Sequence, residues 1–179
     1  MNVCVYGAAS DEIDDSFIRA GEALGKTLAG RGAGLVFGGG AHGMMGAAAR
    51  GAHSMGGFIL GVAPRFFDRP GVLYEACTEF VFTETIRERK QYMEDNSDAF
   101  IVTPGGIGTM EEFFEMLTLK TLDRTQKPIV LYNVNGYYDP LRQMLQVSAA
   151  QGFLRPEDLS AFLITDDPDE ILRYIMENV

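Results

Sequence analysis

The residues best suited to chemistry form one stretch, Thr103 to Glu112, in which three glycines precede a pair of carboxylates. An apolar run from Ala99 to Val102 comes directly before it and predicts a short buried strand. The apolar spacing after it predicts an amphipathic helix that begins near Thr109. A strand that turns through glycines into a helix gathers unpaired backbone N–H groups at the positive end of the helix dipole. The stretch therefore predicts a phosphate site with Glu112 beside it.

A simpler interpretation of the same residues remains open. Thr109 and Glu112 have the T-x-x-E spacing of a capping box, in which each side chain satisfies the backbone N–H group of the other residue. The glycines need do no more than make a tight turn. Other parts of the chain must decide between the two interpretations.

A second glycine-rich segment follows an earlier apolar run and contains G-x-G-x-x-G at Gly38, Gly40 and Gly43. Two features count against dinucleotide binding: the motif follows the second predicted strand, and the strand after it ends without an acid suited to a ribose diol. We interpret these glycines as allowing close approach of the backbone to a smaller ligand or to the sheet. Gly39 and Gly40 are therefore candidate pocket residues.

Two polar residues near these glycines carry weaker predictions. Ser10 follows the first predicted strand and is a candidate pocket residue, although a simple helix cap is the more common role for serine there. His42 lies within the glycine segment and is interpreted as a loop residue rather than a catalyst.

Three basic residues, Arg87, Arg89 and Lys90, cluster in an otherwise acidic chain. A guanidinium is the better group for holding an anion rigidly. The alternative is a solvated helix face on which these cations pair with Glu84, Glu88 and Glu94.

Composition excludes several classes of function. The 179 residues suit one domain, 1–179, with 46% hydrophobic and 22% charged residues. A net charge of −10 argues against nucleic acid and anionic membranes as partners. Two cysteines and two histidines without ligand spacing predict no metal site, and Cys4 is expected to be a buried thiol. No stretch is as long as a membrane span and the apolar N-terminal run is too short for a signal peptide, so we expect a cytoplasmic protein.

Predicted strands alternate with predicted helices along the whole chain. The strands are expected at 3–6, 34–37, 58–63, 79–83, 99–102, 128–132 and 161–164. Helices are expected at 11–31, 85–96, 138–150 and 168–177, with a helical turn at 156–159; one further helix follows Gly46 and ends near residue 55, and another begins near residue 109. This order predicts an α/β protein with a Rossmann-like, doubly wound, mostly parallel sheet and helices on both faces. Ligands bind such sheets beyond the carboxyl ends of the strands, where Gly7, Gly38 and Pro104 all fall. Met116, Met144 and Met176 occupy helical positions expected to face the core.

Residues Pro104 to Glu112 resemble the P-G-G-x-G-T-x-x-E signature of the LONELY GUY family, the cytokinin-activating phosphoribohydrolases. The segments Gly38–Gly46 and Gly61–Pro64 resemble further parts of that family. A second family signature, M-H-x-R-K followed by M, is matched by Arg89, Lys90 and Met93, whereas Ile86 and Arg87 replace the usual Met and His.

The resemblance implies a substrate and roles for individual residues. The substrate would be a nucleoside 5′-monophosphate of an adenine-type base, N6-isopentenyladenine being favoured, and water would cleave its N-glycosidic bond. Glu112 would be the catalytic carboxylate, and Arg89 would keep it ionised and position the phosphate. The phosphate cradle would comprise Gly105, Gly106, Ile107, Gly108 and Thr109, with Lys90, Glu111 and Thr118 lining the substrate. The resemblance also implies at least a homodimer, and no metal or redox cofactor.

Three other functions compete with this one. Relatives with this type of sheet carry nucleotide-like cofactors such as molybdopterin without cleaving them, but a carrier has no use for both Arg89 and Glu112. A nucleosidase for AMP without a hormone role remains open, because base preference depends on the shape of the pocket. A lysine decarboxylase is rejected, because no pyridoxal-type lysine site is recognisable and 179 residues are few for the usual fold of that cofactor's enzymes.

Overall fold

A computed structural model of residues 1–179 contains one sheet of seven strands, all parallel. The strands are β1 (Asn2–Tyr6), β2 (Gly34–Phe37), β3 (Ile59–Pro64), β4 (Glu79–Thr83), β5 (Ala99–Val102), β6 (Ile129–Tyr132) and β7 (Leu163–Thr165). Their order in the sheet is β4-β3-β2-β1-β5-β6-β7, so that β1 pairs with both β2 and β5. The predicted doubly wound parallel sheet is confirmed.

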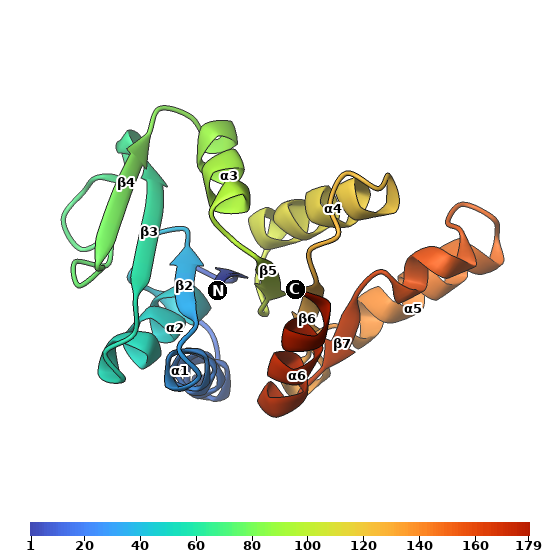
Figure 1. The fold of residues 1–179 in the computed structure, drawn as a ribbon, viewed down its shortest axis with the longest axis horizontal. Coiled ribbons are helices and arrows are strands. Elements are labelled where there is room, and N and C mark those ends of the chain that lie inside the picture. The colour runs from blue at the N-terminus through green and yellow to red at the C-terminus, as the bar shows by residue number, and fades with distance from the viewer.

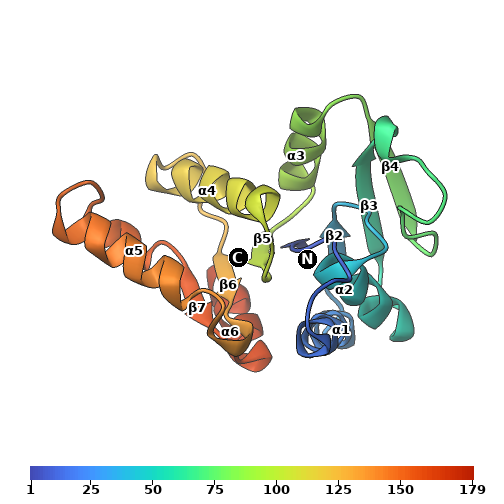
Figure 2. The ribbon, with the colours of Figure 1, turned by 180° about the vertical axis from the view of Figure 1, so that it is seen from behind.

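Six helices cover the two faces of this sheet (Figure 1). They are α1 (Asp15–Gly30), α2 (Gly43–Ser54), α3 (Ile86–Asp95), α4 (Ile107–Thr121), α5 (Asp139–Ala150) and α6 (Pro168–Asn178). Helices α1, α2 and α6 lie on one face, and α3, α4 and α5 lie on the other. The view from behind shows the same division, with α3 and α4 on the same side of the strands (Figure 2).

Each face of the sheet has its own apolar core. On β1, Val3 and Val5 point into the cluster with α1, α2 and α6, while Cys4 and Tyr6 point into the cluster with α3, α4 and α5. Strands buried on both faces are expected to be continuously apolar, as β2, β5 and the part of β1 after Asn2 are. Cys4 is buried as predicted, and burial raises the pKa of its thiol well above the usual range.

The structure confirms a helical turn at residues 156–160, which has the 3₁₀ form, and corrects two other local predictions. The first helix begins at Asp15, and Asp14 rather than Ser10 is its cap, accepting a hydrogen bond from the Ser16 N–H group. Met116 is buried as expected, but Met144 and Met176 are exposed, because α5 and α6 turn those positions towards solvent.

None of the helices combines the length and the apolar character needed to cross a membrane.

Candidate active site

The site lies where the order of the sheet reverses, at the carboxyl ends of β1 and β5. The chain leaves β1 towards one face and β5 towards the other, which opens a crevice between the two loops. The loops are held together by hydrogen bonds from the Thr103 N–H group to Tyr6 O (2.8 Å) and from the Ala8 N–H group to Pro104 O (3.0 Å). A β-carbon at Gly7 would lie 2.1 Å from Thr103 Oγ1, so this close approach requires glycine.

Helix α4 presents its first backbone N–H groups to this crevice. Its first internal hydrogen bond runs from the Met110 N–H group to Gly106 O, so the N–H groups of residues 106–109 have no partner within the helix. Gly106 is the cap and supplies no side chain to satisfy them. The capping box between Thr109 and Glu112 is therefore not formed, and α4 begins two residues earlier than predicted.

A cavity of about 500 Å³ faces these N–H groups. Gly106, Ile107, Gly108 and Thr109 line it together with both glutamates of the signature and Arg89 of α3; the remaining lining residues are Gly7, Ala8, Ala9, Met45, Phe67 and Ile86. Tertiary structure therefore brings together seven of the residues predicted for the site. We call this space the cradle cavity.

An ion pair between Arg89 and Glu112 forms part of the wall of the cradle cavity. Arg89 Nη2 donates to Glu112 Oε1 at 2.6 Å, and the two side chains are only 15% and 9% exposed. Arg89 Nε is buried and has no hydrogen-bond partner. A buried donor without a partner is costly, and it is suited to an oxygen atom of a ligand.

Opposing effects bring the pKa of the Glu112 carboxyl group close to neutral pH. Burial raises the pKa of its carboxyl group to about 7, the neighbouring charge of Glu111 adds to the rise, and Arg89 and Lys90 oppose it. Burial therefore raises this pKa by more than the Arg89 guanidinium lowers it, and the role of Arg89 in keeping Glu112 ionised stays a prediction. A carboxyl group with such a pKa can exchange a proton during a reaction at pH 7.

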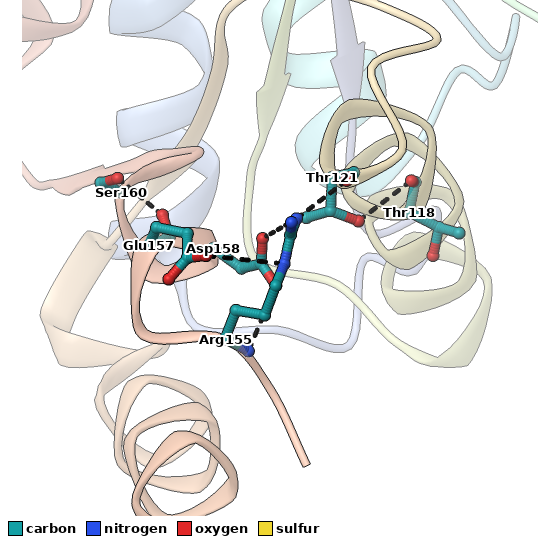
Figure 3. A network of polar contacts seen from close by, with 6 residues as sticks. All are labelled: Thr118, Thr121, Arg155, Glu157, Asp158 and Ser160. Carbon is teal, nitrogen blue, oxygen red and sulfur yellow. Dashed lines mark hydrogen bonds and ion pairs between the residues drawn. The ribbon is translucent and has the colours of Figure 1, made fainter. Parts of the chain in front are cut away.

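Lys90 and Thr118 lie outside the lining of the cradle cavity. Lys90 is nearly buried and pairs with Glu111 and with Glu115, whose Oε2 lies 2.8 Å from Lys90 Nζ. Thr118 is exposed near the end of α4, where its carbonyl accepts a hydrogen bond from Thr121 next to the Arg155–Asp158 pair (Figure 3). The proposed roles of both residues towards a substrate stay predictions.

The basic cluster is not a solvated face that pairs along its own helix. Arg89 and Lys90 both pair with glutamates of α4, and Glu84 pairs with Arg65 instead. Arg87 is exposed and forms no ion pair, while the adjacent Ile86 lines the cradle cavity. Of the two residues that depart from the second family signature, apolar Ile86 lines the cradle cavity and charged Arg87 does not.

A second cavity, of about 360 Å³, adjoins the first and shares Ala9, Met45, Phe67 and Arg89 with it. Its other lining residues are Gly38, Gly40, His42, Val72 and Leu73, and we call it the side cavity. Gly40 thus lines this cavity, and its role towards a ligand stays a prediction.

Gly39 and Ser10 lie elsewhere. At Gly39, with φ of +76°, an added β-carbon would meet the Phe80 ring, so this glycine serves the packing of the sheet. Ser10 accepts a hydrogen bond from the Glu12 N–H group and lines a smaller hollow with Tyr137.

Sequence reasoning missed several residues of the site. Phe67, Val72 and Leu73 come from the irregular connection between β3 and β4, where no apolar periodicity indicates which side chains face a cavity. Tyr137 was also missed as a support: its hydroxyl group donates to Gly105 O at 2.6 Å and fixes the turn before α4. A local pattern gives no signal for either role, since both depend on contacts between distant segments.

Comparison with known proteins gives the family. Residues 45–175 match the family model described as "Possible lysine decarboxylase". The chain is also 39% identical over 171 residues to a cytokinin riboside 5′-monophosphate phosphoribohydrolase of Mycobacterium tuberculosis, a match that covers 96% of this chain and 91% of the relative. The chain belongs to the family of these phosphoribohydrolases. A relative of the same name in Rhodococcoides fascians is 36% identical, with 93% of this chain and 84% of the relative covered. The resemblance to LONELY GUY proteins is thereby confirmed, and these curated relatives carry the name of a hydrolase rather than a decarboxylase.

Solved structures agree on the fold. The molybdenum cofactor carrier protein of Chlamydomonas reinhardtii superposes with a TM-score of 0.73 at 22% identity, covering 98% of this chain and 96% of that one. The molybdenum cofactor binding protein of Rippkaea orientalis gives 0.71 at 20% identity, with 98% and 95% covered. At such identities the likeness extends to the fold alone.

Proposed function

We propose that the protein hydrolyses the N-glycosidic bond of a nucleoside 5′-monophosphate with an adenine-type base and releases the free base and ribose 5-phosphate. The Arg89–Glu112 pair on the wall of the cradle cavity carries this proposal. The names of the curated relatives, which match the chain almost from end to end, support the same reaction and suggest a cytokinin nucleotide as the substrate.

The phosphate group fits the N-terminal end of α4. Four backbone N–H groups there have no helical partner, and the helix dipole adds positive potential. Arg89 contributes a fixed positive charge and a free Nε donor. Such a local site is necessary because the protein as a whole is acidic and repels anions.

Glu112 supplies the chemistry. When the bond between C1′ and the base breaks, its electron pair leaves with the base and positive charge develops on the ribose. An ionised carboxylate beside that centre stabilises the charge, as in glycoside hydrolysis. Water then bonds to C1′ and gives up a proton, for which a carboxylate with a pKa near 7 is a suited acceptor. A proton is delivered to the departing base, so that the atoms of one water molecule divide between the two products.

The test is a product assay with AMP and with N6-isopentenyl-AMP, in which free base and ribose 5-phosphate are both measured. We expect release from at least one of them, and a loss of about a thousandfold or more in Glu112→Gln, because the amide carries no charge and accepts no proton.

Glu115→Gln is the matched control, since Glu115 lies on the same helix and pairs with Lys90 but does not line the cradle cavity. Its activity should stay within a few fold of the original. Tight nucleotide binding without release of base would contradict the hydrolase and favour a non-catalytic carrier; release from AMP alone would favour the general nucleosidase.

We further propose that the chain acts as a homodimer in the cytoplasm. Exposed apolar side chains on α3 and α4, among them Ile86, Tyr92 and Ile107, support self-association next to the site. Light scattering of the purified protein should give twice the mass of one chain, and a mass of one chain would contradict the dimer.

A further inference from the structure

The connection between β3 and β4, residues 65–77, forms one wall of the side cavity, and we call it the strap. Most of its residues are exposed, while Phe67, Val72 and Leu73 line the cavity. A segment with so few buried side chains has low local stability. The contacts that fasten the strap therefore decide the shape of the cavity behind it.

Few contacts fasten the strap to the glycine segment after β2. Two are backbone hydrogen bonds, from the Ala41 N–H group to Val72 O and from the Tyr74 N–H group to Gly39 O, both 2.9 Å. The third is the hydrogen bond of His42 Nε2 with Gly71 O at 2.8 Å. No other side chain outside the strap forms a hydrogen bond with residues 66–73.

The second nitrogen of His42 binds the loop that follows β1. His42 Nδ1 contacts Asp11 Oδ2, and Asp11 Oδ1 accepts a hydrogen bond from the Gly43 N–H group at 2.8 Å. Both ring nitrogens thus face oxygen acceptors, one a carbonyl and one a carboxylate. A neutral imidazole has only one N–H group, so both hydrogen bonds form together only when His42 is protonated.

The surrounding charges favour that state. The Gly71 carbonyl and then the Asp11 carboxylate raise the pKa of His42 above its ordinary value, and Arg50 of α2 opposes the rise. Arg50 is itself held by Ala41 O and by Glu22 of α1. The pKa of Asp11 is lowered, first by the Gly43 N–H group and then by His42, so the two partners shift in the directions expected of an ion pair.

We propose that protonated His42 is a positioning residue, which ties the strap to the β1–α1 loop and thereby sets the affinity for nucleotides whose N6 substituent fills the side cavity. The nucleotide part of this inference rests on the proposed function. Met45, Phe67, Val72 and Leu73 give the cavity an apolar lining that suits an alkenyl group rather than a bare amino group. AMP, which has no such group, needs the strap far less.

The direction of the pH effect follows from the two acceptors. Below the ordinary pKa of histidine, about 6.5, both hydrogen bonds are present. As the pH rises through the raised pKa of His42, one proton is lost, and the remaining one stays on Nδ1, because a bond to a carboxylate is stronger than one to a carbonyl. The bond to Gly71 is then the one that breaks, and the strap is released at high pH.

Asp11→Asn is a sharp control for this mechanism. The new amide can still accept from the Gly43 N–H group and can donate to His42 Nδ1. Neutral His42 then carries its proton on Nε2 and keeps the bond to Gly71. This variant should hold the strap at pH 9 as firmly as at pH 6, whereas a purely structural role for Asp11 predicts a looser strap at both.

Hydrogen–deuterium exchange of the peptide that spans residues 65–77 tests the strap without any nucleotide. Exchange is compared between proteins at each pH, so that the intrinsic effect of pH cancels. At pH 6 we expect the original protein and Asp11→Asn to be protected alike and His42→Ala to exchange about tenfold faster. At pH 9 only Asp11→Asn should remain protected. Equal exchange in all three proteins at pH 6 would overturn the inference, as would an original protein that stays protected at pH 9.

Steady-state kinetics with both nucleotides test the link to specificity. At pH 9 the KM for N6-isopentenyl-AMP should be about tenfold higher in the original protein than in Asp11→Asn, which changes a residue that lines neither cavity, while kcat and the KM for AMP should differ little between the two proteins. An equal difference in KM for both nucleotides would overturn the specificity claim. If neither nucleotide is cleaved by the original protein, the proposed function fails, and the exchange experiment still decides whether His42 holds the strap.

Discussion

Two segments of this chain have the same local design and serve different ends. Each is a buried strand followed by closely spaced glycines and a helix: Gly38–Gly46 after β2 and Gly105–Gly108 after β5. In the first, added β-carbons at Gly43 and Gly46 would lie 2.4 Å from Ala8 O and 1.9 Å from Ala41 O. In the second, a β-carbon at Gly105 would lie 2.2 Å from Thr109 Oγ1, whereas β-carbons at Gly106 and Gly108 would meet nothing within 4 Å.

The difference separates glycines that permit packing from glycines that leave space. Gly43, the first residue of α2, lets the helix approach the loop after β1, and α2 and α1 are packed through further glycines such as Gly25 and Gly51. Those at the start of α4 face an open cavity, so the absent side chain leaves room for a ligand. A glycine-rich turn is evidence for a binding site only where the space it leaves is empty of protein.

The largest effect should come from filling the packed turn. In Gly46→Ala the new methyl group collides with the backbone of Ala41, and overpacking of this kind costs about 3 kcal/mol. We expect the melting temperature to fall by roughly 10 °C, as measured by calorimetry. An unchanged melting temperature would remove the distinction between the two turns.

Filling the open turn should affect binding and leave the fold intact. Gly108→Ala adds a methyl group at the wall of the cradle cavity, where alanine is also the better helix former by roughly 1 kcal/mol. The melting temperature should stay the same or rise, while the KM for the nucleotide increases about tenfold. A KM that does not change would mean that the phosphate lies elsewhere.

The smallest effect concerns the charge beside Glu112. If Glu112 acts as an ionised carboxylate, kcat/KM should increase as the pH rises through about 7. Glu111→Gln removes a charge that raises the pKa of Glu112, so this limb of the pH profile should move to lower pH. The shift should be roughly a few tenths of a unit, because the Glu111 side chain is half exposed.

Glu115→Gln is the control for that profile, because Glu115 also pairs with Lys90 but does not line the cradle cavity. A displacement of the limb to higher pH in Glu111→Gln would contradict the stated origin of the pKa.

Much of the fold could be predicted from apolar runs and their spacing. Seven strands and the helices between them were expected in the right order, since buried parallel strands and amphipathic helices leave strong periodic signals. Boundaries and rotations were less accessible. The start of α4 at Ile107 and the exposure of Met144 depend on how each helix seats on the sheet, which its own spacing does not specify.

The candidate site divides in the same way. The strand, the glycine turn and the helix of the cradle could be predicted from the sequence, as could the importance of Arg89 and Glu112, because these features are encoded within short stretches. Contacts between distant segments, which no short stretch encodes, pair these two side chains across 23 positions, raise the pKa of Glu112 to about 7, and bring the strap to His42. The reason is physical: the sheet order places α3 beside α4 and the strap beside the loop after β2, and burial between α3 and α4 raises the pKa of Glu112.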